Sequence, residues 1–484
     1  FHTRKDYGLV NEVFHTRHMK NLSGYVGLGH TRYATIGTGD LDEVQPFLGP
    51  SPFGVMFVHN GNLFNSHELK KELFEKDHRM VNSDSDGEVI LNMLTKSLSN
   101  QNAKKIAPQN IWKAVESVYK RSHGAYSVIT YIARTGMVAF RDPHGIRPLV
   151  FGKRENGLTT DYIFASESVT LDILGFELIG DVGPGEVIFI DEKTRKVFRK
   201  NVMKKNEIPC IFEYVYFARP DSMMNNISVY NSRMRMWQKL AKKIKMARLS
   251  IDVVVPVPDS SRTAELALAE ALEIKYREGL VKNRYIGRTF IMPGQKIRKK
   301  SIRYKLNAMF LLIKGKKVLL VDDSIVRGNT SRQIIQMVRN AGAKKVYFAS
   351  YYAPVISPCL YGIDIPTKEE LIASDHSIDE VCKILGADKM FYSEVKDVFD
   401  ACKEGNSKEF ARSARSRQEA GNPPVAEALL KDFCMACVDK KYKTGDIDEK
   451  VLKKQAESRL FEQACGKIED ESDDDGSDDQ LNLV

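Results

Sequence analysis

The chain has 484 residues, of which 43% are hydrophobic and 28% are charged. A chain of this length exceeds what one hydrophobic core usually supports, so we expect two domains of ordinary size with extensions. The composition excludes a globally disordered protein, and the absence of a membrane-length apolar run and of a signal-like start predicts a cytoplasmic protein without a membrane partner.

The formal net charge is +10. Eight acidic residues lie between Glu469 and Asp479, so the rest of the chain carries +18. A basic body favours phosphorylated small molecules or nucleic acid as partners, and the alternative is a solvated cationic surface. Because no basic segment is interleaved with stacking aromatics, we expect no nucleic-acid partner.

Residues 1–207 contain short apolar runs separated by glycine turns, which predict β-strands. The runs are residues 25–28, 55–58, 126–132 and 186–190. Helical patterns occur at 66–74 and 87–98. This mixture predicts layered α+β structure.

Four short segments of this first half carry polar residues beside glycines. They read GLGHTRYAT at 27–35, HNGNL at 59–63, SDGE at 85–88 and RDPHGIRP at 141–148. Taken separately, HNGN reads as a turn and Arg32 as a surface cation. Their order along the chain is the more informative feature.

From residue 208, strands alternate with amphipathic helices. Trp237, Leu240 and Ile244 fall on one helical face. The next elements are strands at 253–257, 317–321 and 346–350, and helices at 262–273 and 330–340. This alternation predicts βαβ units around a parallel sheet.

The most informative segment is 318–331, which reads VLLVDDSIVRGNTS. A buried strand ends in Asp322 and Asp323, and a loop of small residues then opens a helix. Such a loop presents backbone N–H groups to a phosphate, and adjacent carboxylates bind ribose hydroxyls or Mg²⁺. The alternative is an ordinary turn with solvated aspartates.

Segment 318–331 resembles the signature of type I phosphoribosyltransferases and, in its wording, that of the amidophosphoribosyltransferase family. The first three of the four segments in the first half resemble the glutamine-site segments of class II amidotransferases, and the RDPHGIRP segment follows them as a further match in the order of the family. The resemblance implies an α+β N-terminal-nucleophile glutaminase domain (an αββα sandwich) followed by an α/β type I phosphoribosyltransferase domain. We expect these domains at 1–207 and 208–402, a helical extension at 403–467 and a disordered acidic tail at 468–484.

The resemblance implies that Ser261, Asp322 and Asp323 surround a Mg²⁺ ion. It assigns substrate binding to Asp259, Lys282, Arg284, Arg288, Arg327, Gly328, Asn329, Thr330 and Ser331. The cations between 298 and 305 suit a lid over a polyanion, and a solvated face is the alternative.

In the glutamine half, the resemblance implies that Arg32 binds the substrate α-carboxylate and Asp86 its α-ammonium group. The Asn60 side chain and the Gly61 N–H would form the oxyanion hole. The nucleophile in this family is an N-terminal Cys, whereas Phe1 has no thiol. We therefore expect a truncated chain that uses free ammonia, and a full gene product that uses glutamine.

Seven cysteines in an intracellular chain favour metal or catalytic use over disulfides. Cys434 and Cys437 form a CxxC pair, and the resemblance adds Cys210 and Cys359 as ligands of a 4Fe-4S cluster. Four thiolates also suit tetrahedral zinc, and only the resemblance favours iron. The remaining cysteines read as core or incidental thiols.

The resemblance implies the first committed step of purine (IMP) biosynthesis, in which phosphoribosyl pyrophosphate and glutamine-derived ammonia give 5-phosphoribosylamine. It further implies a homotetramer inhibited by purine nucleotides. One rival is a sugar-phosphate aminating enzyme, which the DDSIVRGNTS segment opposes. The other is a catalytically impaired regulatory or scaffold homologue that binds nucleotides and partners.

Overall fold

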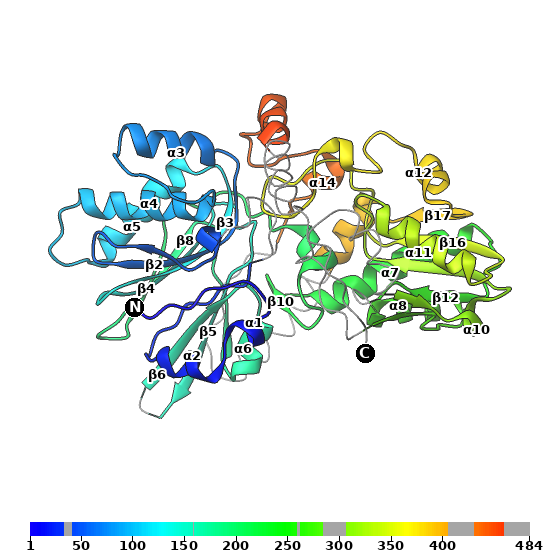
Figure 1. The fold of residues 1–484 in the computed structure, drawn as a ribbon, viewed down its shortest axis with the longest axis horizontal. Coiled ribbons are helices and arrows are strands. Elements are labelled where there is room, and N and C mark those ends of the chain that lie inside the picture. Colours follow the sequence, from blue (N-terminus) through cyan, green and yellow to red (C-terminus); the bar gives the residue numbers. More distant parts are fainter. Residues whose placement is uncertain (33–40, 158, 259–261, 284–305, 405–429, 459–484) are drawn as a thin grey trace, which may run out of the picture.

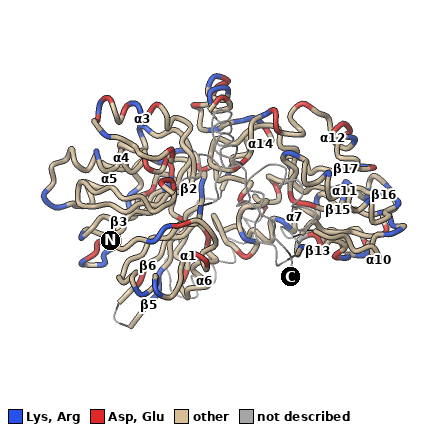
Figure 2. Tube along the Cα trace, in the orientation of Figure 1, with Lys and Arg blue, Asp and Glu red and all other residues tan. Residues whose placement is uncertain are grey.

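The structure is a computed structural model that describes residues 1–32, 41–157, 159–258, 262–283, 306–404 and 430–458. Two halves follow one another along the chain, and residues 430–458 lie at the junction between them (Figure 1). Basic and acidic residues are interspersed over both halves (Figure 2), so the net charge alone identifies no face as a binding surface.

The first half is built on a six-stranded antiparallel sheet in the order β1-β2-β3-β4-β8-β9. Its strands are β1 Phe47–Gly49, β2 Val55–Leu63, β3 Gly124–Ile132, β4 Gly136–Arg141, β8 Glu186–Asp191 and β9 Val197–Asn201. The helices α3 Ser66–Glu75, α4 Asp86–Asn100 and α5 Pro108–Arg121 pack together on it. Leu94, Val115 and Phe57 are fully buried between these layers, so the apolar faces of helices and sheet form one core.

A smaller antiparallel sheet faces the first one, with the order β6-β5-β7. Its elements are β5 Val150–Asn156, β6 Thr159–Ala165, β7 Glu177–Asp181 and the covering helix α6 Val169–Leu174. Ala139 and Ile188 of the large sheet pack against Phe151 and Phe164 of the small one. Leu171 of α6 is buried on the outer side. The predicted αββα layering is therefore confirmed.

One expectation for this half was wrong. Residues 25–28 form no strand, because Tyr25 is 77% exposed and the segment pairs with no described strand. The remaining short elements before the small sheet are α1 Val10–Val13, α2 Thr16–Asn21 and η1 Leu41–Glu43.

The second half contains the predicted parallel sheet, in the order β12-β15-β16-β17. Its strands are β12 Val253–Pro256, β15 Lys317–Asp322, β16 Lys345–Ser350 and β17 Lys389–Tyr392. Helices α7 Val229–Met246 and α8 Arg262–Leu272 belong to one face, and α11 Asn329–Asn340 and α12 Ile378–Leu385 to the other. Along β15, Leu319 packs toward α7 and Leu320 toward α11, because successive strand residues point to opposite faces.

Short elements complete this half. They are the π-helix η2 Glu213–Phe217, the hairpins β10 Met223–Met224 with β11 Ile227–Ser228 and β13 Leu280–Lys282 with β14 Leu306–Ala308, the helix α10 Phe310–Ile313 and the 3-10 helix η4 Lys368–Glu370. None of the described helices is both long and apolar enough to cross a membrane.

The C-terminal segment 430–458 contacts both halves. It contains α14 Ala436–Asp439 and a helical stretch at 449–458. Cys434 pairs with the chain at the domain junction, since its N–H donates to Pro209 O at 3.0 Å and its carbonyl accepts from Ile211 N at 3.2 Å. Further along, Gln455 Nε2 donates to Phe64 O at 2.8 Å. Of the predicted extension at 403–467, residues 405–429 and 459–467 lie outside the described residues, as does the predicted tail at 468–484.

The parallel sheet gives a direct test of the packing. Leu320→Ala removes a fully buried side chain between β15 and α11, so the free energy of unfolding should fall by about 2–5 kcal/mol. Leu311→Ala is the matched control, because that leucine is 88% exposed and its loss should cost less than about 0.5 kcal/mol. Urea denaturation followed by circular dichroism measures both; equal effects would contradict this placement of Leu320.

Candidate active sites

Asp322 and Asp323 lie where β15 ends, at the carboxyl edge of the parallel sheet. The N–H of Asp323 donates to Asp322 Oδ1 at 3.0 Å, and Ser324 Oγ donates to Asp323 Oδ1 at 2.6 Å. Burial and then the charge of Asp323 raise the pKa of Asp322 well above its ordinary range. Two carboxyl groups so close together in a buried place attract a proton or a cation.

The loop after these acids turns at Gly328, which has a φ of +75° and precedes the first residue of α11. This left-handed conformation favours glycine, and a Cβ at this position would lie 2.5 Å from Ile372 Cδ1, so that the end of the Ile372 side chain would have to move. Asn329 and Thr330 are exposed at the start of α11, whereas Ser331 is buried. The first N–H groups of a helix have no intrahelical acceptor, and this end of α11 is therefore suited to an anion.

A segment distant in the sequence holds this loop. Arg327 forms an ion pair with Glu370 at 2.9 Å, and Ile372 N donates to Val326 O at 3.1 Å. Sequence reasoning missed Glu370, because nothing in its local pattern indicates that η4 folds back onto residues 324–331.

The other residues predicted for this site are placed only in part. Lys282 is exposed at the end of β13 and pairs in register with Leu306. Asp259, Ser261, Arg284, Arg288 and the cations at 298–305 lie outside the described residues. Within the part of the chain that is described, no group of three or more His, Cys, Asp or Glu side chains is arranged around a single metal ion.

In the first half, β2 carries Asn60 and Gly61 beside β3. Gly61 has a φ of +153°, and a Cβ there would lie 2.0 Å from the carbonyl oxygen of Ala125. Glycine is therefore required for this close pairing. Asp86 begins α4 and accepts a hydrogen bond from Leu63 N at 2.8 Å. Asn60, Gly61 and Asp86 thus gather around the end of one strand.

Arg32 forms an ion pair with Glu43, whose side chain is 2% exposed. The predicted carboxylate-binding cation is consequently already engaged by a carboxylate in this structure. A substrate carboxylate at Arg32 would have to share the guanidinium with Glu43, which the sequence did not indicate.

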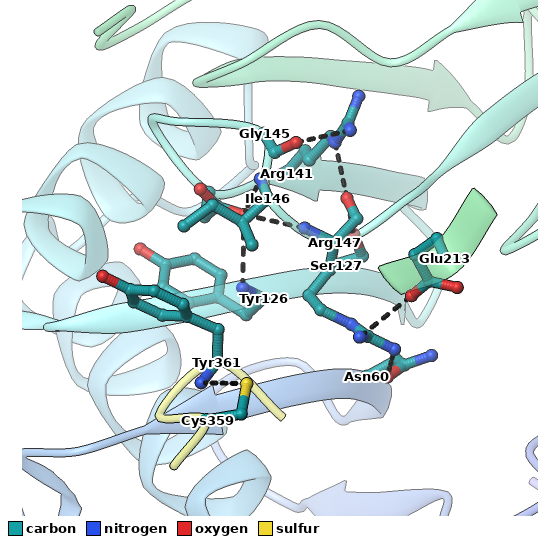
Figure 3. Close-up of polar contacts among 11 residues, drawn as sticks. Asn60, Tyr126, Ser127, Arg141, Gly145, Ile146, Arg147, Glu213, Cys359 and Tyr361 are labelled. Atoms are coloured by element: carbon teal, nitrogen blue, oxygen red, sulfur yellow. Dashed lines mark hydrogen bonds and ion pairs between the residues drawn. The ribbon is translucent and has the colours of Figure 1, made fainter. Parts of the chain in front are cut away.

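The RDPHGIRP segment shapes a buried turn that presents Arg147 (Figure 3). Asp142 accepts from His144 N at 2.9 Å and from Ile146 N at 3.0 Å, and Arg141 Nε donates to Arg147 O at 2.6 Å. Arg147 Nη2 in turn donates to Asn60 Oδ1 at 3.1 Å. The segment is therefore mainly a support for one arginine.

Two histidines lie in the same region. Burial lowers the pKa of His59, whose Nδ1 is 3.6 Å from Asp86 Oδ1. Burial, followed by the neighbouring His59, lowers the pKa of His30 to about 4. Both imidazoles are therefore neutral near pH 7.

The four predicted cluster cysteines gather at the junction. The backbones of Cys210 and Cys434 form an isolated parallel β-bridge. Burial is the main cause that raises the pKa of the Cys210 thiol, and the nearby Cys434 and Cys359 raise it further. Burial likewise raises the pKa of Cys437, to which Cys210 and Cys359 also contribute. None of the cysteines in the described part of the chain forms a disulfide. Each ligand of a 4Fe-4S cluster binds a different iron, so such thiols need not converge on one point.

Comparison with known proteins separates the two halves. A model of the glutamine amidotransferase domain matches residues 30–172, and a model of the phosphoribosyl transferase domain matches residues 229–356. Together with the two sheets and their sites, these matches define the class: a glutamine amidotransferase joined to a phosphoribosyltransferase.

Whole-chain relatives identify the family. The amidophosphoribosyltransferase of Pseudomonas aeruginosa is 48% identical over 458 residues, covering 94% of this chain and 87% of the relative. That of Schizosaccharomyces pombe is 45% identical and covers 84% and 79%. The structure of glutamine phosphoribosylpyrophosphate amidotransferase from B. subtilis, complexed with ADP and GMP, matches with a TM-score of 0.73 and 34% identity over 90% of this chain and 87% of that one. The chain belongs to the amidophosphoribosyltransferase family, the enzymes that link the two activities in purine biosynthesis.

The neutral histidines predict a pH dependence of stability. Because the folded-state pKa of His30 is about 4, below its ordinary value of 6.5, the folded protein binds fewer protons than the unfolded chain between these values. The contribution of His30 to the free energy of unfolding is therefore highest above pH 6.5 and falls as the pH drops toward 4. His30→Gln should reduce the loss of stability between pH 7 and pH 4.5, measured by urea midpoints. His67→Gln, at an exposed position, is the control, and an identical effect of both variants would contradict the assignment.

Proposed function

We propose that Asp322 and Asp323, with Ser261, hold Mg²⁺ and the activated ribose of phosphoribosyl pyrophosphate. The observation that carries this proposal is the pair of adjacent, largely buried carboxyl groups at the end of β15, beside a helix start suited to a phosphate. Mg²⁺ bound there would neutralise charge on the departing pyrophosphate. The raised pKa of Asp322 indicates that its ionised form is disfavoured beside Asp323, and a bound cation would stabilise that form.

The residues of the loop have distinct tasks in the transfer. The N–H groups of Asn329 and Thr330 would bind the 5-phosphate, and the left-handed conformation of Gly328 would turn the backbone toward it. Ammonia would then attack the anomeric carbon from the face opposite the departing pyrophosphate, so that the configuration inverts. Lys282 and the cations at 284–305 would exclude water from this oxocarbenium-like transition state.

In the glutamine half, Asn60 and Gly61 would donate to the oxyanion that forms when the side-chain amide of glutamine is attacked. Asp86 would bind the α-ammonium group, and Arg32 would bind the α-carboxylate while still in contact with Glu43. Neutral His59 beside Asp86 leaves that carboxylate available for the ligand cation.

The four gathered thiols support a 4Fe-4S cluster held by Cys210, Cys359, Cys434 and Cys437. The donor set fits, because four soft ligands lie together and burial raises the pKa of the Cys210 and Cys437 thiols, so that a metal centre would be needed to stabilise them as thiolates. The cluster would join the two halves and the C-terminal segment, and would take no part in the transfer.

The solved relative from B. subtilis was complexed with ADP and GMP. We infer from this and from the family resemblance that purine nucleotides inhibit this chain, that it forms a homotetramer and that it acts in the cytoplasm. The scaffold alternative is the less favoured, since full-length relatives are named as the enzyme and both acids are present.

The sugar half is tested with ammonium salts as nitrogen source. Replacing both acids, by Asp322→Asn with Asp323→Asn, should lower the rate of pyrophosphate release at least about 100-fold, because metal and ribose lose their ligands. Asp379→Asn is the matched control on α12, where the side chain is 80% exposed. Unchanged turnover in the double variant would refute the site, and binding without turnover in the wild type would favour the scaffold.

The cysteine site is tested by composition. Cys434→Ser should remove bound iron and sulfide and the associated visible absorbance, whereas Cys382→Ser on α12 should retain them. A colourless wild-type protein with stoichiometric zinc would contradict the iron assignment.

A further inference from the structure

Arg147 connects β2, the strand that carries Asn60 and Gly61, with the second half of the chain. Its side chain is 3% exposed, and its two terminal nitrogens reach in different directions. Nη2 donates to Asn60 Oδ1 at 3.1 Å, and Nη1 lies 2.9 Å from Glu213 Oε1 in η2. Figure 3 shows the guanidinium between these two partners.

The chemistry of the two groups makes this contact directional. A carboxamide has an acceptor end, Oδ1, and a donor end, Nδ2, and it can rotate to exchange them. A guanidinium only donates. Arg147 therefore stabilises the orientation in which Oδ1 of Asn60 points toward it and Nδ2 points away. An oxyanion requires a donor, so the opposite orientation would present oxygen to the developing negative charge.

Glu213 determines where the guanidinium lies. It is 5% exposed, and burial raises its pKa while Arg147 lowers it. The Arg147 backbone is fixed independently, because its carbonyl accepts from Arg141 Nε at 2.6 Å and from Ser127 Oγ at 3.1 Å. With its backbone fixed in the first half and its charge paired in the second, the side chain has little freedom to release Asn60.

The same strand is also contacted from the loop that carries Cys359. Asn62 Nδ2 donates to Leu360 O at 3.0 Å. Gly362 packs directly on Gly61, since a Cβ on Gly362 would lie 2.7 Å from the carbonyl carbon of Gly61. The second half therefore reaches both proposed oxyanion donors.

We propose that Arg147 is a positioning residue for glutamine hydrolysis: paired with Glu213 across the junction, it orients the Asn60 carboxamide with its NH₂ end toward the oxyanion. This inference rests on the proposed role of Asn60. It assigns to the RDPHGIRP segment a task in the amidotransferase reaction and makes the oxyanion hole depend on a residue of the second half.

The test compares glutamine and ammonium salts as nitrogen sources, in a preparation of the protein that hydrolyses glutamine. Arg147→Lys keeps a cation beside Glu213, yet a single ammonium group cannot contact Glu213 and Asn60 at once as the two terminal nitrogens of the guanidinium do. The kcat with glutamine should fall on the order of 100-fold, which is the effect of removing one oxyanion donor, with little change in the KM for glutamine. The rate with ammonium salts should change by less than about twofold, because that reaction does not use Asn60. Arg147→Met with Glu213→Gln, which leaves no buried charge unpaired, should show the same selective loss.

Two further variants make the outcome decisive. Arg233→Lys alters another buried arginine near the junction that bonds to Tyr214 O and Ala218 O, and it should not change the ratio of the two rates selectively. If Asn60→Ala leaves glutamine hydrolysis intact, the proposed oxyanion role itself fails. The positioning role alone is refuted if Asn60→Ala impairs glutamine hydrolysis while Arg147→Lys leaves it intact. It is also refuted if Arg147→Lys lowers the rates with glutamine and with ammonium salts equally.

Crystal structures of the chain supply a readout that does not depend on glutamine turnover. In the wild type, Asn60 should occupy one conformer with Oδ1 in hydrogen-bond contact with Arg147, and in Arg147→Lys it should rotate or occupy several. An unchanged single conformer in the variant would overturn the inference.

Discussion

The approach of Gly61 to Gly362 is the constraint on which the arrangement of the two halves depends. A side chain on either residue would collide with backbone, on Ala125 in one case and on Gly61 itself in the other. The loop after Cys359 can therefore lie directly on β2 of the first half. Asn62, Arg147 and Glu213 add polar contacts around this point, so that the junction is a buried, specific surface in which charged groups are paired.

Much of the fold was accessible from the sequence because its signals were local. Trp237, Leu240 and Ile244 share the helical face that the structure buries, and the strand before Asp322 is apolar because a parallel strand is covered on both faces. The segment at 25–28 has a similar apolar pattern and no strand partner, and pattern alone does not distinguish these cases. Pairing is a property of the neighbours that a segment meets.

The candidate sites follow the same division. Motifs pointed to Asp322, Gly328, Asn60 and Asp86, since each lies in or beside an element whose pattern is readable from the sequence. They did not indicate Glu43 beside Arg32, Glu370 beside Arg327 or Glu213 beside Arg147. These three acids come from other segments; two of them pair with the predicted cations Arg32 and Arg327, and the third pairs with Arg147. The charge partners of a site are set by tertiary structure, which short sequence patterns do not encode.

The pairing of Cys434 with Pro209 and Ile211 has a consequence for how the protein is made. Residues emerge from the ribosome in order, and domains generally fold as units with the N-terminal one first. Both sheets are complete in the sequence before Cys434 and Cys437 are translated. The contacts that join the halves through this segment are consequently the last to form, and a nascent chain stopped before residue 430 would lack them while it could already form the Arg147–Glu213 pair and the Gly61–Gly362 contact.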